Sequence, residues 1–248
     1  MKNLLRYVLG TVLAWCLRFR SRPYAFPPGL ALVLAPHADD ETLGCGGLLA
    51  LKNERGDPVE VVFISDSAGA SEEPTTAGLA GRRHRESLAA LAALGIGAEH
   101  VHFLAAPDGH LNRLAPGESA RVQSVLVDLV KRLEPAEVFV PYLGGGSTEH
   151  DATVQLARNA LSAIGAGTQV WEYPVWAWWD PRRLVGQLWR PEQNFHLSLG
   201  MARARKHAAL ACHASQLEAL PGTRQPALPP VLAALCTGPT EFFFHRQP

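Results

Sequence analysis

Apolar residues along this chain form two alternating patterns. Short, nearly continuous apolar runs predict buried strands, and they cover residues 30–36, 59–66, 100–106, 137–143, 168–176 and 240–245. Longer segments with apolar residues at helical spacing predict helices over residues 42–56, 79–95, 119–134 (with Ser119 as its cap), 151 to about 164 and 201–220. This alternation predicts an α/β sandwich with a mostly parallel sheet, in a single domain over residues 23–248.

The first 22 residues carry a pattern of their own. Apolar residues recur at helical spacing between Leu4 and Phe19, and no acidic residue accompanies the basic residues Lys2, Arg6, Arg18, Arg20 and Arg22. The central apolar run is about half of the ~20 residues that span a bilayer. A basic amphipathic helix on an anionic membrane surface therefore fits best. A helix packed on the protein or on a partner, and a cleaved or inserted segment, stay open as alternatives.

Charge and cysteine content narrow the class of protein. The chain of 248 residues has 23 basic and 23 acidic side chains, so no overall positive field would attract nucleic acid. Its four cysteines lie far apart and form no CxxC motif. A chain of this length does not need disulfides, so we expect reduced thiols in a cytoplasmic protein, peripheral at the inner face of the membrane if the N-terminal helix binds lipid.

The string "PHADDETLGCGG" (36–47) concentrates polar side chains after the first buried strand, at the edge where open α/β sheets bind ligands. His37 and Asp40 offer one nitrogen and one oxygen ligand, with Asp39 between them. A divalent cation would remove the penalty of adjacent buried carboxylates. Catalytic zinc usually has three protein ligands, and His150 is the best third candidate. From these residues alone, a helix cap or a phosphate-binding glycine turn stays open.

The same string resembles the signature of the PIG-L/LmbE-like zinc-dependent N-acetylglucosaminyl deacetylases, which is close to (A/P)-H-x-D-D-E-x-x-G-x-G-G. Three later matches follow in the order of the family: an R-x-x-E helix in 83–95, a Pro-Asp-Gly loop in 104–111 and a K-x-x-A-x-x-x-H-x-S-Q helix in 206–216. The resemblance covers roughly residues 29–245. It implies a Rossmann-like three-layer sandwich that removes the N-acetyl group from an N-acetylglucosamine-type sugar.

The resemblance implies roles for four residues at the centre of the site. His37, Asp40 and His150 would bind one zinc ion per chain, although iron also suits such nitrogen and oxygen ligands. Asp39 would be the general base, which takes a proton from the attacking water before the leaving amine is protonated. The products would be acetate and a free amino sugar.

Further residues would surround this centre. By the same resemblance, Arg83 and Asp108 would bind polar groups of the substrate, and Glu41 would orient a ligand or a nearby backbone group. The glycines of "GCGG" would let the helix approach the sheet and would leave room for a sugar.

One position departs from the family's pattern. The family usually has H-x-x-H at the third ligand, and the first histidine helps to stabilise the tetrahedral oxyanion. Here the stretch is "STEH", so Ser147 would donate a hydrogen bond without carrying a positive charge. One lost oxyanion donor costs ~10²–10³ in rate. We expect Ser147 and His213 to be catalytic, with zinc or His110 as alternative sources of stabilisation and weak activity as a further alternative.

The acceptor glycan is less well defined. The segment "WEYPVWAWWD" (171–180) would either stack on sugar rings or pack in the core. Together with the basic N-terminal helix, it favours an envelope glycan or lipid-linked glycoconjugate over a small thiol-glycoside. The rival functions are an amidase for a larger N-acyl group, a non-catalytic sugar- or nucleotide-binding module, and a membrane-surface scaffold.

Overall fold

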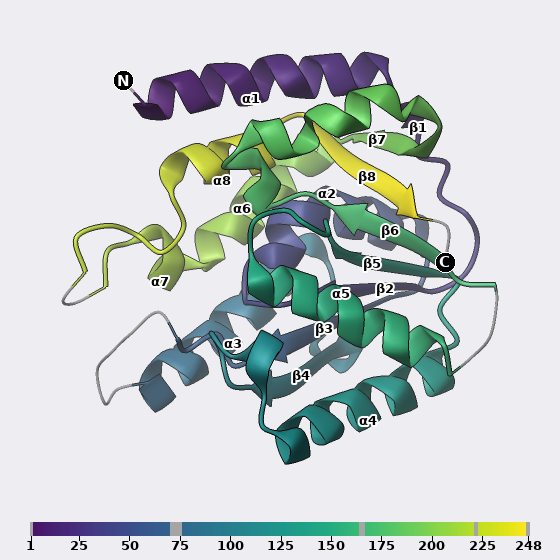
Figure 1. Ribbon diagram of the computed structural model, residues 1–248, viewed down its shortest axis with the longest axis vertical. Coiled ribbons are helices and arrows are strands. Elements are labelled where there is room, and N and C mark those ends of the chain that lie inside the picture. Colours follow the sequence, from purple (N-terminus) through teal and green to yellow (C-terminus); the bar gives the residue numbers. More distant parts are fainter. Residues whose placement is uncertain (1, 70–75, 164–166, 221–222, 247–248) are drawn as a thin grey trace.

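A single mixed sheet lies at the centre of the protein (Figure 1). The computed structural model describes residues 2–69, 76–163, 167–220 and 223–246. Within these residues the strands are ordered β1-β7-β8-β6-β5-β2-β3-β4 across the sheet. Their bounds are β1 (Arg22–Pro23), β2 (Ala31–Ala35), β3 (Val59–Ser65), β4 (Val101–Ala106), β5 (Glu137–Pro141), β6 (Gln169–Tyr173), β7 (Asn194–Ser198) and β8 (Thr240–Arg246).

Strand β2 lies inside the sheet, paired in parallel with β3 and β5. Every residue of its apolar sequence is buried, as expected for a parallel strand that is covered on both faces. Parallel pairing continues outward to β4 and β6, whereas β8 runs antiparallel to both of its neighbours. The prediction of an α/β fold with a mostly parallel sheet is confirmed.

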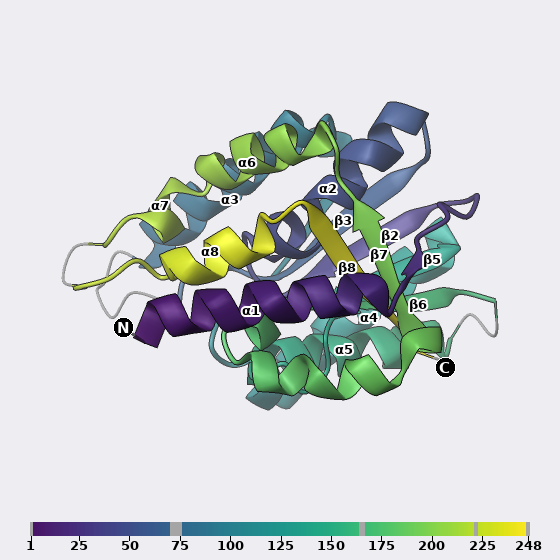
Figure 2. The same ribbon diagram turned by 90° about the horizontal axis from the view of Figure 1, so that it is seen from above.

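Helices cover both faces of the sheet and make three layers (Figure 2). Alternate residues of β2 point to two separate cores: Val33 packs in the core that includes Leu48 of α2, and Leu34 in the core that includes Leu126 of α4. The helix bounds are α1 (Lys2–Phe19), α2 (Asp40–Arg55), α3 (Thr76–Leu94), α4 (Pro116–Leu133), α5 (Thr148–Leu161), α6 (Ala202–Cys212), α7 (Ala214–Leu217) and α8 (Pro230–Cys236).

Several predicted boundaries were wrong. Helix α4 begins at Pro116, whose fixed backbone suits the first helical turn, so Ser119 lies inside the helix and does not cap it. Helix α5 begins at Thr148, earlier than predicted, and its predicted end near residue 164 lies outside the described residues. The predicted helix over 201–220 is divided at His213 into α6 and α7.

Helix α1 packs on the surface of the domain, where Leu13 and Leu17 are buried. None of the helices in the described part of the chain has the length and apolar character that crossing a bilayer requires. The four cysteines are free thiols, as expected.

Candidate active site

The carboxyl ends of β2, β3 and β4 lie at one edge of the sheet, and the backbone is strained there. Asp39, Ser67 and Ala105 follow or end these strands with φ angles of 115°, 57° and 50°. Such positive values are unfavourable for residues with a Cβ and persist where the surrounding structure holds them. The strain therefore marks the edge at which α/β sheets bind their ligands.

The structure brings together the three predicted metal ligands, whose donor atoms all lie within 4.8 Å of one another. His37 comes from the loop after β2, Asp40 begins α2 and His150 lies in the first turn of α5. The same oxygen of Asp40, Oδ2, lies 3.1 Å from Nδ1 of His37 and 3.2 Å from Nε2 of His150. Two chain segments more than 100 residues apart thus converge on one carboxylate.

These residues fit a divalent metal ion. His150 is 2% exposed and Asp40 is 1% exposed. Apart from its approach to Asp40, the buried Nε2 atom of His150 has no hydrogen-bond partner among the described residues. A buried nitrogen without a partner is costly unless something else occupies its lone pair. Two imidazole nitrogens and one carboxylate oxygen are a donor set that suits zinc and leaves room for substrate or water.

A second group of possible ligands shares His37 and contains Asp108 and Glu149. Nε2 of His37 lies 3.1 Å from Oδ1 of Asp108 and 3.7 Å from Oε2 of Glu149. Both carboxylates already accept backbone N–H groups, from Gly69 at 2.9 Å and from the loop 109–111 at 3.1 and 2.9 Å. In metal sites, carboxylates placed in this way hold a metal-ligating histidine in its orientation. Asp108 therefore contacts His37 in addition to lining the site.

Asp39 faces a cavity of about 210 Å³, which we call the site cavity. Its side chain makes no hydrogen bond with another described residue. Burial raises the pKa of Asp39 well above its usual value, and the charges of Asp40 and Glu41 raise it further. Six of the predicted site residues line the site cavity: His37, Asp39, Asp40, Arg83, Asp108 and Ser147.

Glu41 lies behind Asp39 and is fully buried. Its Oε2 accepts the backbone N–H of Asp39 at 3.0 Å, and its Oε1 lies 3.1 Å from Nε2 of His213. His213 is fully buried as well and does not line the site cavity. His213 is thus connected to the site cavity through Glu41 and the backbone of Asp39, and its catalytic role stays a prediction.

Ser147 caps α5, and its Oγ accepts the backbone N–H of His150 at 3.4 Å. It therefore both borders the site cavity and begins the helical turn that carries His150. The helix begins at this point because a serine oxygen can accept one of the free N–H groups of the first turn.

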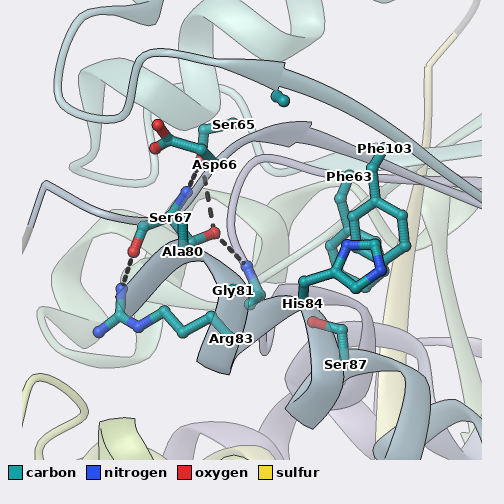
Figure 3. A pocket seen from close by; sticks show the side chains of 12 residues that line it. Phe63, Ser65, Asp66, Ser67, Ala80, Gly81, Arg83, His84, Ser87 and Phe103 are labelled. Carbon is teal, nitrogen blue, oxygen red and sulfur yellow. Dashed lines mark hydrogen bonds between the residues drawn. The ribbon is translucent and has the colours of Figure 1, made fainter. Parts of the chain in front are cut away.

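Arg83 lies between the site cavity and a neighbouring cavity of about 240 Å³, which we call the side cavity. In Figure 3 its guanidinium points to Ser67, whose carbonyl accepts a hydrogen bond from Nη1. Nε and Nη2 of Arg83 are buried without a partner among the described residues. Burial lowers the pKa of Arg83, an effect that the charges of Asp39 and Asp108 oppose. Two of its donors are thus available to a ligand.

The R-x-x-E motif and the late K-x-x-A-x-x-x-H-x-S-Q motif contact each other beside the site. Glu86 of the R-x-x-E helix accepts the hydroxyl of Ser215 at 2.6 Å and its backbone N–H at 3.0 Å. The next residue, Gln216, donates to the carbonyl of Ala38 and lines the site cavity. Sequence reasoning did not assign a role to Gln216 or Glu149, although both lie inside or beside motifs that it identified.

The rings of the tryptophan-rich segment lie in two different environments. Trp171 and Trp178 are buried in the core, whereas Trp176 lines the site cavity. Only one ring of the segment is therefore placed at the cavity.

The glycines after Glu41 serve the packing of α2. A Cβ at Gly44 would lie 2.2 Å from the ring of Tyr173, and a Cβ at Gly47 would lie 2.2 Å from Leu199. Neither glycine borders the site cavity, so the expectation that they leave room for a sugar is wrong. They allow α2 to approach the chain that carries Tyr173 and Leu199.

Comparison with solved structures identifies the class of fold. N,N'-diacetylchitobiose deacetylase from Pyrococcus horikoshii is 20% identical, with a TM-score of 0.61 over 88% of this chain and 80% of that chain. The A40926 pseudoaglycone deacetylase is 21% identical, with a TM-score of 0.61 over 87% and 96%. The 4-carboxy-2-hydroxymuconate hydratase from Pseudomonas putida KT2440 is 22% identical, with a TM-score of 0.61 over 84% and 83%. The protein therefore has the LmbE-like deacetylase fold, which also occurs in a hydratase.

Sequence comparison identifies the family. The pattern of the PIG-L family, described as GlcNAc-PI de-N-acetylase, matches residues 32–161, which is more than half of the chain. The chain belongs to the PIG-L family, and the resemblance seen in its motifs is confirmed. Comparison with curated protein sequences gives no match.

Proposed function

We propose that the protein is a metal-dependent deacetylase that hydrolyses the N-acetyl amide of an N-acetylglucosamine-type sugar. The observation that carries the proposal is the convergence of His37, Asp40 and His150 beside a carboxylate, Asp39, with no hydrogen bond to another described side chain. Membership of the PIG-L family supports the same reaction. The fold alone does not specify it, because one structure of this fold is a hydratase.

His37, Asp40 and His150 would hold the metal ion, and zinc suits their donor atoms best. When bound, zinc supplies Lewis acidity, which acidifies water and polarises a carbonyl. Asp39 takes one proton from the attacking water as the new C–O bond forms at the acetyl carbon. It then gives that proton to the amine nitrogen as the C–N bond breaks, so that acetate and the free amino sugar are released.

Three residues of the site cavity suit the substrate. Arg83 has two buried donors available, which suit the hydroxyl or anionic groups of a sugar derivative. Ser147 accepts a backbone N–H at its oxygen, and its hydrogen can donate to the oxygen of the tetrahedral intermediate. Trp176 offers an aromatic face for a pyranose ring.

The deacetylase neighbours act on N,N'-diacetylchitobiose and on the pseudoaglycone of the antimicrobial A40926, according to their names. These names support an acetylated amino sugar as the substrate class of this chain. An envelope glycan or lipid-linked glycoconjugate remains our preferred acceptor because of the basic N-terminal helix.

Acetate release tests the proposal directly. The purified protein, loaded with zinc, is incubated with N-acetylated amino sugars and glycans, and free acetate and the deacetylated product are measured by mass spectrometry. We expect acetate and product in equal amounts, whereas a binding module would give binding without acetate.

Metal content tests the proposed ligands. His150→Ala removes one of three ligands and should abolish stoichiometric zinc, as measured by elemental analysis after dialysis. His207, which is exposed on α6, gives the matched control His207→Ala, and this variant should keep its zinc. Equal zinc in the two variants would show that the third ligand lies elsewhere.

The side cavity favours a second candidate, an amidase for an N-acyl group longer than acetyl. Apolar residues such as Phe63 and Phe103 line it, and it shares Arg83 with the site cavity (Figure 3). Gly81→Leu would partly fill the side cavity, because a Cβ at this position meets only the end of Arg85, at 3.6 Å. If the side cavity holds the acyl chain, the variant should lose activity on longer N-acyl sugars and keep activity on the acetyl compound. Equal loss on both would reject this candidate.

A further inference from the structure

Helix α1 contacts the rest of the domain through one narrow side. Gly10, Leu13 and Leu17 are its buried residues, and they lie at the spacing of a single helical stripe. Gly10 fits closely against α8, since a Cβ there would lie 2.8 Å from the side chain of Leu235. Figure 2 shows α1 along the surface beside α8.

The opposite side of α1 is apolar as well, and it is exposed. At 3.6 residues per turn, the apolar residues on this side lie within an arc of about 100° around the helix axis, and the arc points away from the domain. Val8, Trp15 and Phe19 are 48%, 65% and 71% exposed, and the rings of Trp15 and Phe19 contact each other edge to face with centroids 4.5 Å apart. We call this surface the outer stripe, and it consists of Leu4, Leu5, Val8, Val12, Trp15 and Phe19.

A helix on the surface of a globular protein normally presents charged and polar residues to water. A contiguous apolar face in that position marks an interaction site. The stripe is not needed for packing within the domain, because the other side of α1 already makes those contacts.

Charge decides which kind of partner suits the outer stripe. The segment 1–22 contains Lys2, Arg6, Arg18, Arg20 and Arg22 and no acidic residue. Arg6 packs over Trp179 of the domain. A second copy of the chain docked on the same stripe would bring the other cations together without an anion to pair them. A bilayer with anionic headgroups, in contrast, offers an apolar phase for the stripe and phosphates for the cations.

We propose that α1 binds the surface of an anionic lipid bilayer, with the outer stripe in the layer between headgroups and acyl chains. Trp15 is suited to that depth, because its ring is apolar and its N–H is polar. The helix lies along the membrane plane and does not cross it, in agreement with the finding that no described helix is long and apolar enough to span a bilayer. The proposal does not depend on the reaction, because lipid binding is measured without a substrate.

Helix α1 also contacts a segment that borders the site cavity. The guanidinium of Arg6 lies 4.0 Å above the ring of Trp179, next to the 3₁₀ helix η3 (Trp176–Trp178). Trp176, at the start of η3, lines the site cavity. Helix α1 is thus connected to the lining of the site cavity through residues 176–179.

Vesicle co-sedimentation of the full chain tests the proposal. We expect at least tenfold tighter binding to vesicles of phosphatidylglycerol and phosphatidylcholine than to vesicles of phosphatidylcholine alone. Val8→Glu/Trp15→Glu should reduce binding at least tenfold, because it places two anions in the stripe. Lys2→Gln/Arg18→Gln should reduce it about fivefold for each cation removed.

Val125→Glu is the matched control, since Val125 is an exposed valine on α4, far from α1 in the chain. It should bind vesicles like the unchanged protein, and the unfolding curves of all variants should show that they are folded. The proposal is wrong if the unchanged protein does not bind anionic vesicles, or if Val8→Glu/Trp15→Glu binds them equally well. It is also wrong if sedimentation equilibrium shows a dimer that Val8→Glu/Trp15→Glu abolishes, because a second copy would then cover the stripe.

Discussion

The site cavity and the outer stripe of α1 depart from the usual distribution of residues in opposite ways. At the cavity, Asp40 and Glu41 are almost completely buried, although carboxylates are normally exposed. On α1, Trp15 and Phe19 are mostly exposed, although large aromatic residues are normally buried. We propose a missing partner for each departure: a cation for the buried charges of the site and an apolar phase for the exposed rings.

The two regions also differ in how the rest of the protein supports them. Glu41 and Glu149 each accept backbone N–H groups from the loops around the site, so the charged residues are held by many hydrogen bonds. On the outer stripe, the rings of Trp15 and Phe19 contact each other, and no residue of the stripe belongs to either buried core. Changes near the site should therefore affect folding and metal binding, whereas changes in the stripe should affect only association.

The largest expected effect on the free energy of unfolding comes from breaking a buried ion pair. Nζ of Lys206 lies 2.6 Å from Oε1 of Glu241, and both side chains are almost inaccessible. Lys206→Met should lower the free energy of unfolding by about 3–5 kcal/mol, because it leaves Glu241 buried without its cation. Lys131→Met on the exposed surface of α4 is the control and should change stability little. Equal denaturant midpoints would show that the buried charge does not need its partner.

The next largest effect on stability is expected where α2 lies close to β6. Gly44→Ala would place a Cβ 2.2 Å from the ring of Tyr173, so the core must shift. We expect destabilisation by about 1–3 kcal/mol in urea unfolding. Gly78→Ala, where nothing lies within 4 Å, makes the same change in α3 and should stabilise the protein slightly. The same sign of change at both positions would contradict the packing role of Gly44.

Asp108 distinguishes a substrate-binding role from the positioning of His37. If Asp108 holds Nε2 of His37, Asp108→Asn should weaken zinc binding about tenfold to hundredfold, as measured by competition with a chelator. If Asp108 only binds substrate, zinc affinity should stay unchanged and the KM alone should rise.

The smallest effect on stability should come from the outer stripe. Val8→Glu changes an exposed side chain that makes no contact with the cores, so the free energy of unfolding should change by no more than about 0.5 kcal/mol. Thermal unfolding measures this change. A large loss of stability would show that Val8 supports the fold, and the outer stripe would then no longer contrast with the site.

The sequence predicts the sheet well, because its parallel strands are continuous apolar runs. Strand β7 was not predicted. It is short, it follows an irregular segment of 3₁₀ turns, and its sequence has neither a clear alternation of apolar and polar residues nor β-branched residues. Helix α8 was missed for a similar reason, since its seven residues stand in a proline-rich stretch. Predicted helix boundaries were wrong where a single residue determines the boundary, as Pro116 does at the start of α4.

The site was predictable in part. His37, Asp39 and Asp40 are neighbours in the chain, and His150 follows a strand that ends at the same edge of the sheet. The positions of Glu149 and His213 depend on the tertiary packing of α5 and α6, which no local pattern encodes. The predicted metal ligands thus lie together in the structure, whereas the contacts that surround them could not be predicted from local sequence.

The most direct test of the account is turnover by Asp39→Asn with its metal content measured in the same sample. Asparagine has nearly the same shape and tolerates the positive φ of 115° at this position, but it cannot accept a proton as a base. We predict that the variant keeps one zinc ion per chain while acetate release from N-acetylglucosamine conjugates falls by about 10²–10⁴. Unchanged acetate release by the zinc-loaded variant would contradict the account.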